Sequence, residues 1–284
     1  MNTYFPTDYQ AFIHTSRYAK WLDSENRREN WSETVNRYVD NLVLPKIKDD
    51  ETVMAVREAI TNLDVMPSMR AMMSSGKAFD RDNVAGYNCS YLPVDDIRSF
   101  DEAMFILLCG TGVGFSVERQ YVNELPTVPK NLINLDETIV VPDSKEGWAY
   151  SLRTLISSLY NGVVPKWDVT LVRPAGAKLK TFGGRASGPA PLVDLFQFVV
   201  SKFKEASGEK LTSLQCHDIM CKIGEVVVVG GVRRSAMISL SNLSDDRMRH
   251  AKSGAYWEAN GQRNLANNSV AYTDKPDSTS FMRE

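Results

Sequence analysis

The sequence predicts an α/β protein in which the strands of a parallel sheet or barrel alternate with helices. Three observations favour this class. Short apolar or alternating runs, typical of strands, recur between longer segments with helical periodicity. Turn-forming residues separate many of these segments. The 284 residues, 43% hydrophobic and 24% charged, have an ordinary globular composition and can bury a large core in one domain or two.

The first part of the chain, to about Asn62, is expected to be helical. Apolar residues at helical spacing predict a helix over Glu33–Val43, with Ser32 as its cap and Pro45 ending it. A second helix is expected over Glu51–Leu63.

From Pro67 onward, strands and helices are expected to alternate, which is typical of a parallel sheet or barrel. The expected strands are 86–93, 112–117, 138–142, 167–172, 226–229, 236–241 and 268–272. The expected helices are 97–110, from 143 or 144 to 160, from 189 or 191 to about 205, and 211–223. Residues 118–190 are richer in proline and glycine, which favours an insertion or a loop-rich face.

The stretch after the apolar run Val226–Val229 is the most distinctive local pattern. It begins with two glycines and contains two adjacent arginines: Gly230, Gly231, Val232, Arg233, Arg234 and Ser235. Loops at strand ends carry ligands in α/β proteins, and a pair of guanidinium groups suits a phosphate. The alternative is a surface turn with solvated arginines.

Bulk properties exclude several classes of protein. The net charge of −2 gives no global basic field, so we expect no nucleic-acid partner. No apolar stretch reaches the ~20 residues of a membrane span, and the first residues lack the apolar core of a secretory signal. Four cysteines are too few for a disulfide scaffold in this length. A cytoplasmic protein with free thiols is therefore expected.

Two motifs resemble known binding sites, but the sequence around them does not support that interpretation. Gly110–Gly114 contains the glycines of a dinucleotide fingerprint, but a helix precedes it and a strand follows, the reverse of the Rossmann order. Cys216, His217 and Cys221 suggest a zinc site, but two cysteines five positions apart on a helix face different sides. We therefore expect neither NAD nor a metal site.

Cys89 leaves two readings open. It lies on an expected strand between the polar residues Asn88 and Ser90. A buried, inert thiol is one reading. The other is a thiol aimed into a cavity, because alternate residues of a barrel strand point inward.

Five segments, taken together, resemble the adenosylcobalamin-dependent (class II) ribonucleoside-triphosphate reductases, especially the monomeric type. In chain order they are Met66–Met72, Asn88-Cys89, Gly112–Ser116, Val140–Trp148 and Gly230–Ala236. Each is a modest match alone, whereas five in order from about residue 65 to the end are specific.

The resemblance implies a fold and a domain organisation. The family fold is a ten-stranded α/β barrel made of two five-stranded halves, and this chain would carry the N-terminal part. Residues 1–63 would form a helical N-terminal segment, and residues 64–284 the first half of the barrel. An insertion at about 120–187, which includes Pro142-Asp143-Ser144, would supply one wall of an effector site.

The resemblance also implies roles for individual residues in the reduction of ribonucleotides to 2′-deoxyribonucleotides by thiyl-radical chemistry. Cys89 resembles one of the two thiols that reduce the ribose. The substrate would lie along Ser68, Asn88, Thr111 and Gly112. The segment Gly230–Ser235 resembles the specificity loop between a deoxynucleotide effector and the substrate base. Adenosylcobalamin would supply the radical, and a thioredoxin-type protein the electrons.

The sequence departs from the family in one respect that bears on function. It contains no Asn-x-Cys-x-Glu segment, which carries the radical cysteine of the family. We therefore expect a partner chain that supplies the C-terminal portion, or a truncated product. The alternative function is a noncatalytic module that binds deoxynucleotides without turnover.

Overall fold

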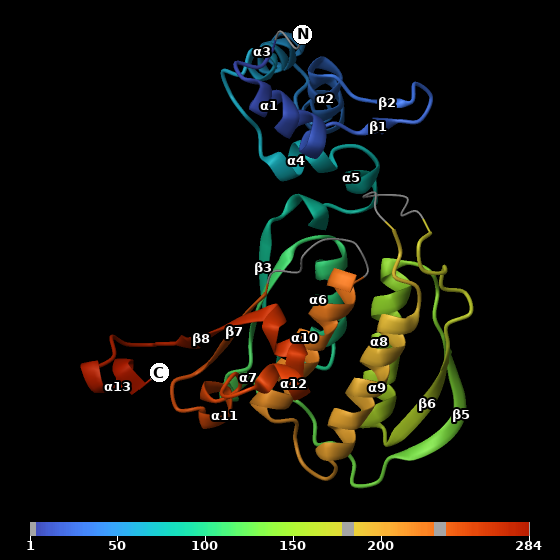
Figure 1. Cartoon of the computed structure of the whole chain (residues 1–284), viewed down its shortest axis with the longest axis vertical. Helices are drawn as coiled ribbons and strands as arrows, with labels where there is room; N and C mark the ends of the chain where they lie inside the picture. Colours follow the sequence, from blue (N-terminus) through green and yellow to red (C-terminus); the bar gives the residue numbers. More distant parts are fainter. Residues whose placement is uncertain (1–3, 178–184, 230–236, 284) are drawn as a thin grey trace. The chain divides into compact units, whose positions relative to one another are not determined.

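The structure is a computed structural model that describes residues 4–177, 185–229 and 237–283. The chain divides into two compact units, Met1–Asn88 and Cys89–Glu284, which are described separately. Figure 1 labels their helices and strands in chain order. The first unit is largely helical, and the second carries the parallel sheet.

The first unit is built on a small core around Trp31, Val35 and Ile60. Its helices and its short hairpin are α1 Asp8–Ile13, β1 Trp21–Leu22, β2 Arg27–Arg28, α2 Trp31–Tyr38, α3 Asp50–Thr61, α4 Met69–Ser74 and α5 Lys77–Arg81, with a π-helical turn at Val39–Val43 that extends α2. The two predicted helices are confirmed, but the cap of the first is Asn30. Its side chain accepts a hydrogen bond from the Glu33 amide while the Glu33 carboxylate accepts one from the Asn30 amide. This reciprocal pair explains why Ser32 is not the cap.

A buried ion pair holds the first unit together. The Arg37 guanidinium donates to both carboxylate oxygens of Glu29, at 2.7 and 2.8 Å, and to the Met72 carbonyl at 2.7 Å. Nearby, Lys20 Nζ donates to the Ser75 carbonyl at 2.6 Å. Burial, together with the neighbouring Arg37 guanidinium, lowers the pKa of Lys20 to about 8.

The second unit contains a four-stranded sheet in the order β3-β4-β7-β8, with every neighbouring pair parallel. A separate parallel pair is formed by β5 and β6. The elements are β3 Cys89–Pro93, α6 Ser99–Leu108, β4 Gly112–Ser116, α7 Arg119–Val122, β5 Ile133–Val140, α8 Lys145–Tyr160, β6 Val163–Asp168, α9 Ala190–Glu205, α10 Ser213–Val229, β7 Met237–Asn242, α11 Asp246–Arg249, α12 Tyr256–Asn260, β8 Ala266–Ala271 and α13 Ser278–Arg283.

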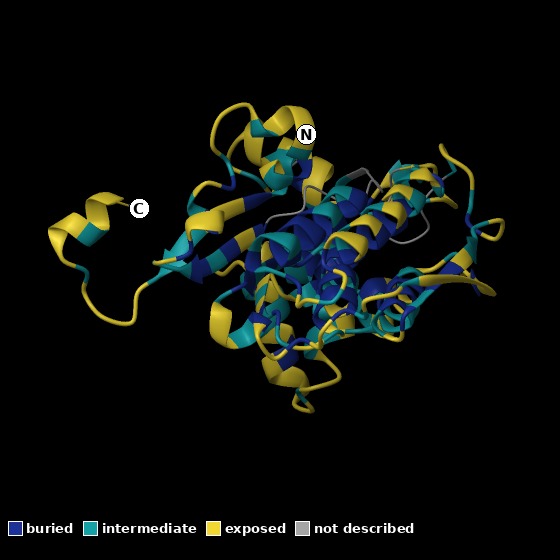
Figure 2. Cartoon of the chain, turned by 90° about the horizontal axis from the view of Figure 1, so that it is seen from below, coloured by how far each residue is buried: buried dark blue, intermediate teal, exposed yellow. Residues whose placement is uncertain are grey.

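Helices cover one face of the four-stranded sheet. α6 packs on β3 and β4, and α10 packs on β7. Val113, Phe115, Met237 and Ala266 point into this layer and are buried. Figure 2 shows the buried residues of this unit concentrated in these strands and helices. The alternate residues of the strands, among them Cys89 and Tyr91, lie on the other face and are exposed.

Four helices of this unit pack in a ring. α6 contacts α8, α8 contacts α9, α9 contacts α10, and α10 contacts α6. α8 buries one face in this arrangement, through Leu152, Leu155, Ile156 and Leu159. It begins where expected, because the Ser144 hydroxyl caps it by accepting from the Gly147 amide at 2.9 Å.

Three predicted strands need correction. Val226–Val229 is the last turn of α10 and not a strand, because it continues the buried helical spacing of Cys216, Ile219 and Ile223. A short buried apolar run does not by itself distinguish strand from helix. The other two corrections are of position: β5 is longer than 138–142, and β6 ends at Asp168 where the sequence predicted a strand over 167–172.

A buried ion pair attaches α10 to the 3₁₀ turn Gly261–Leu265. Asp218, 2% exposed, accepts from Arg263 Nε at 2.6 Å and from Arg263 Nη2 at 2.7 Å. Burial alone would raise the pKa of Asp218, but the hydrogen bonds from Arg263 and His217 outweigh it and lower that pKa.

We predict that Asp218→Asn lowers the free energy of unfolding by about 3 kcal/mol, because it leaves the Arg263 charge buried without its counter-ion. The control is Asp136→Asn, which removes an ion pair to Lys166 whose side chains are 94% and 67% exposed. That variant should lose less than about 1 kcal/mol. Urea unfolding of both variants measures the difference, and equal losses would contradict the prediction.

Lys20 predicts a dependence of stability on pH. Between about pH 8 and its ordinary pKa of 10.5, Lys20 is neutral in the folded chain but still protonated in the unfolded chain. The unfolded state therefore binds more protons, and stability rises with pH across this window. In Lys20→Met this contribution is absent.

The unfolding free energy of the wild type relative to Lys20→Met should therefore increase from pH 7 to pH 10, as measured by urea unfolding. Lys48→Met serves as the control for removal of an exposed lysine. If the unfolding free energy of the wild type relative to Lys20→Met falls as the pH rises, the predicted direction of the pH dependence is wrong.

Candidate active site

Cys89 is the first residue of β3 and is exposed on the open face of the sheet. Strand alternation places Tyr91 on the same face, where it is 53% exposed, while Leu92 is buried on the helix side. Of the two readings of Cys89 left open by the sequence, the structure supports the accessible thiol.

Two half-buried glycines of β4 lie beside this thiol. Cys89 is in register with Gly112, and Tyr91 with Gly114. A Cβ atom on Gly114 would lie 3.2 Å from Ile238 Cγ2 and 3.7 Å from Tyr91 Cδ2. The neighbouring strands therefore leave little room for a side chain at Gly114.

Thr111 joins α6 to β4 and is brought close to Cys89 by the β3–β4 pairing. It is 2% exposed, and its amide donates to the Ile106 carbonyl at 3.3 Å. The whole residue is therefore covered, and the residue in register with Cys89 is Gly112. Asn88, which immediately precedes Cys89 in the chain, is exposed and accepts a hydrogen bond from Arg70 Nε at 3.2 Å.

The other predicted site residues lie in the first unit or outside the described residues. Ser68 is exposed at the start of α4, in the first unit, and makes no side-chain cap there. The segment Gly230–Ser235 lies outside the described residues. The residues described on either side of it are Val229, at the end of α10, and Met237, at the start of β7 beside β4.

The open face contains residues that the sequence reasoning missed. Tyr91, Ile238 and Asn267 share a row with Gly114 across the four strands. Burial, with smaller effects of neighbouring Tyr121, raises the pKa of Tyr91. The signal that could have identified them is the period-2 alternation in each strand, once the strands were paired.

The cluster Cys216, His217 and Cys221 is buried in α10. His217 Nε2 lies 3.2 Å from Asn268 Oδ1, which connects α10 to the edge strand β8. Burial raises the pKa of both thiols well above the ordinary value. Within the described residues, no group of three or more His, Cys, Asp or Glu side chains is arranged to hold a metal ion.

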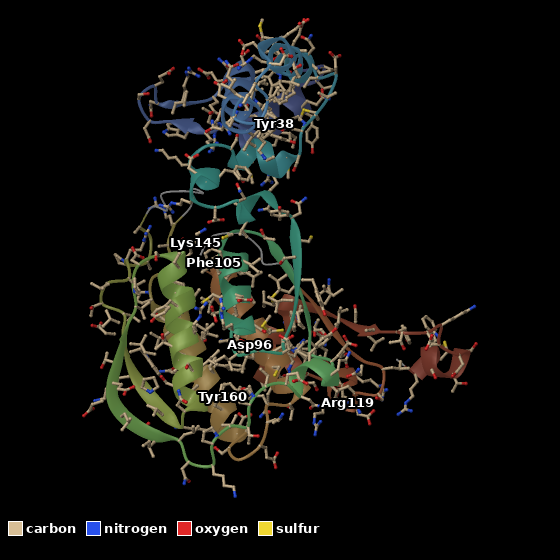
Figure 3. The ribbon with its side chains drawn as sticks, turned by 180° about the vertical axis from the view of Figure 1, so that it is seen from behind. Tyr38, Asp96, Phe105, Arg119, Lys145 and Tyr160 are labelled. Carbon is tan, nitrogen blue, oxygen red and sulfur yellow. The ribbon has the colours of Figure 1, made fainter. Side chains whose placement is uncertain are left out.

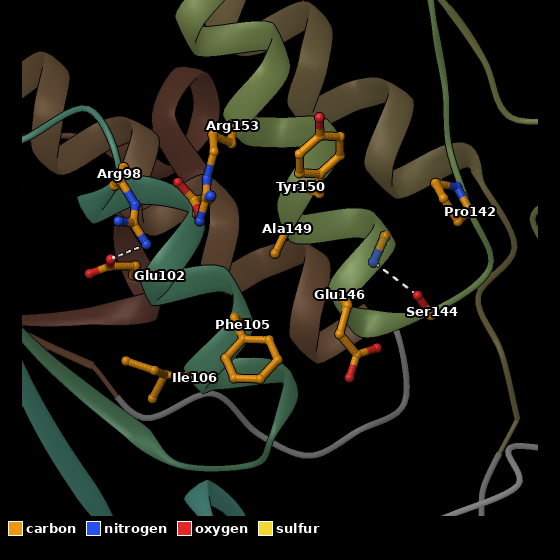
Figure 4. A pocket seen from close by; sticks show the side chains of 12 residues that line it. Arg98, Glu102, Phe105, Ile106, Pro142, Ser144, Glu146, Ala149, Tyr150 and Arg153 are labelled. Atoms are coloured by element: carbon orange, nitrogen blue, oxygen red, sulfur yellow. Dashed lines mark hydrogen bonds and ion pairs between the residues drawn. The ribbon is translucent and has the colours of Figure 1, made fainter. Parts of the chain in front are cut away.

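A cavity of about 700 Å³ lies between α6 and α8. Figure 4 shows the side chains that line it, which include Arg98, Phe105, Ser144, Tyr150 and Arg153. Arg153 Nη2 donates to the buried Asp101 carboxylate at 2.6 Å, so an ion pair crosses between the two helices. Ser144 belongs to the segment that the sequence assigned to an effector wall, and its neighbour Asp143 accepts from Arg173 Nε at 2.7 Å.

Comparison with known proteins identifies relatives of this chain. Residues 127–202 match the family model described as the insertion domain of B12-dependent ribonucleotide reductase. The chain is 29% identical to the adenosylcobalamin-dependent ribonucleoside-triphosphate reductase of Lactobacillus gasseri and 30% identical to that of Lactobacillus helveticus. These alignments cover 92% and 91% of this chain and 44% of each relative, so the chain spans less than half the length of those curated proteins.

A solved structure supports the fold. The crystal structure of a B12-dependent (class II) ribonucleotide reductase superposes with a TM-score of 0.78 at 24% identity, covering 92% of this chain and 45% of that protein. The predicted α/β class and its relation to this barrel are confirmed. The chain is therefore a homologue of the N-terminal portion of the adenosylcobalamin-dependent ribonucleoside-triphosphate reductases.

Proposed function

We propose that this chain supplies the substrate and effector surfaces of a ribonucleotide reductase that converts ribonucleoside triphosphates to 2′-deoxyribonucleotides. The observation that carries the proposal is the exposed thiol of Cys89, in register with Gly112, in a chain that aligns with such reductases over nine-tenths of its length. Fold alone would not support an activity, whereas an exposed thiol can act on a bound ribose.

Cys89 would provide one half of a two-electron reductant. Replacing the 2′-hydroxyl by hydrogen releases water and consumes two electrons, and two thiols supply them by forming a disulfide. The other three cysteines of the chain are buried, so none offers a second exposed thiol. The partner thiol and the radical cysteine would therefore come from a segment outside these 284 residues, and a thioredoxin-type protein would reduce the disulfide for the next turnover.

The relatives are named as adenosylcobalamin-dependent reductases, so adenosylcobalamin is the cofactor that we propose for the complete reductase. We propose that most cobalamin contacts lie in the remainder of the reductase. When bound there, adenosylcobalamin supplies the radical that side chains alone cannot generate.

The nucleotide contacts are proposed from the resemblance to the reductases. It assigns the substrate ribose and phosphates to Ser68, Asn88, Thr111 and Gly112. Gly230–Ser235 would form the specificity loop, with Arg233 contacting base or phosphate. The insertion around Pro142–Ser144, whose helix α8 packs in the four-helix ring, would form a wall of the deoxynucleotide effector site. Binding on the two sides of one loop couples the two affinities reciprocally.

None of the helices that the structure describes combines the length and apolar character needed to cross a lipid bilayer. We propose a cytoplasmic location, where a thiol reductant is available.

We predict that Cys89→Ser abolishes multiple turnover when the chain is combined with a polypeptide carrying the rest of a class II reductase, adenosylcobalamin and a dithiol. Product formation should fall to about 1% or less of the wild-type rate, because the disulfide cannot form. Cys221→Ala is the matched control, since it removes a buried thiol that does not reach the open face. The assay measures deoxynucleotide product by chromatography, with folding checked by circular dichroism.

Turnover that survives Cys89→Ser would refute the role of Cys89. Deoxynucleotide binding without any turnover by the wild-type pair would instead favour a noncatalytic nucleotide-binding module.

Arg233→Ala is predicted to weaken deoxynucleotide binding by this chain about 10- to 100-fold, through loss of a charge-assisted hydrogen bond. Arg17→Ala, which removes an exposed arginine of the first unit, is the control and should leave affinity unchanged. Isothermal titration calorimetry with each deoxynucleoside triphosphate measures both variants. Equal affinities for wild type and Arg233→Ala would remove Arg233 from the effector contacts.

A further inference from the structure

We propose that Cys109 and Lys145 form an oxidation-dependent covalent link between the end of α6 and the start of α8. The side chains are already in contact: Lys145 Nζ lies 3.1 Å from Cys109 Sγ. The ammonium also lies over the Phe105 ring, 4.7 Å from its centroid, and Figure 3 labels both residues where α8 begins beside α6. Cys109 and Phe105, both at the end of α6, thus contact the amine of Lys145.

The position of Lys145 is unusual for a lysine. It is the first residue of α8, where the helix dipole disfavours a positive charge. Its side chain is nevertheless only 18% exposed, and Glu146 approaches it no closer than 3.9 Å. Contact with Cys109 and Phe105 therefore replaces much of the water that a lysine at a helix start would otherwise keep.

The surroundings favour oxidation of this buried thiol. A neighbouring ammonium stabilises a thiolate, which is the form that peroxides oxidise. Cys109 itself is buried. However, Phe105 and Ile106, on the same helical face, line the α6–α8 cavity together with Ser144 and Glu146, the neighbours of Lys145. The cavity therefore admits a small neutral oxidant such as hydrogen peroxide to the neighbours of the pair, while Cys109 and Lys145 themselves do not line it.

The chemistry consists of two balanced steps. In the first, the Cys109 thiolate attacks hydrogen peroxide, the O–O bond breaks and an S–O bond forms, so that sulfur becomes a sulfenic acid; the leaving hydroxide takes a proton from the Lys145 ammonium to become water, which leaves Lys145 as a neutral amine. In the second, the neutral amine of Lys145 attacks the sulfur, an S–N bond forms, and the hydroxyl leaves with an amine proton as water. Relative to the thiolate and ammonium, the pair loses two hydrogens and its two opposite charges, and two waters form. A dithiol reverses it by attacking the sulfur and returning the free amine.

The test is mass spectrometry of the full chain after mild treatment with hydrogen peroxide. A tryptic digest should contain one species that joins the peptides of Cys109 and Lys145, with a mass about 2 Da below their sum. Incubation with a dithiol should restore the two separate peptides. This readout requires no nucleotide and no turnover, so it is independent of the proposed function.

Control variants test whether the link is specific to Cys109 and Lys145. Cys109→Ala and Lys145→Gln should each abolish the joined species, whereas Lys166→Gln, at an exposed lysine on β6, should not. Cys216, a buried thiol whose pKa burial alone raises, should form no link and serves as the internal reference. Oxidation of Cys89 in the wild type shows that the peroxide treatment worked. If Cys109 then stays unmodified, or becomes sulfinic or sulfonic acid without a link to Lys145, the proposal is wrong.

Discussion

Parallel pairing of β3, β4, β7 and β8 is the constraint on which the second unit depends. Parallel strands cannot be joined by tight turns, so each connection must cross over the sheet, here through helices. The starts of all four strands consequently meet at one edge. This geometry brings Cys89, Gly112 and Met237 to neighbouring strands, although they are far apart in the sequence. The candidate site is a product of this convergence.

The insertion belongs to the core of the second unit. α8 lies in the stretch matched by the insertion-domain model, yet its apolar face is buried against α6 and α9. The Asp101–Arg153 pair adds a polar link across the same helix pair. This packing connects α8 to α6, whose end leads through Thr111 into Gly112.

Sequence reasoning predicted the elements whose signals are local. The strand at 112–117 and the start of α8, expected at residue 143 or 144, were predicted because alternation and capping chemistry act within a few residues. Val226–Val229 was misassigned because its residues favour strands, whereas burial in the helical ring decided the outcome. The open-face neighbours Tyr91, Ile238 and Asn267 could not be grouped beforehand, since only the strand order and register place them in one row.

The strand that carries Cys89 lies at an edge of the four-stranded sheet. Among the residues that the structure describes, no second strand pairs with its outer backbone groups, and an edge of this kind is a template for association. A strand that paired with this edge would at the same time shelter the thiol of Cys89. A reductase assembled in this way would gate its own chemistry, because the same contact that completes the sheet would also decide which molecules can reach the sulfur.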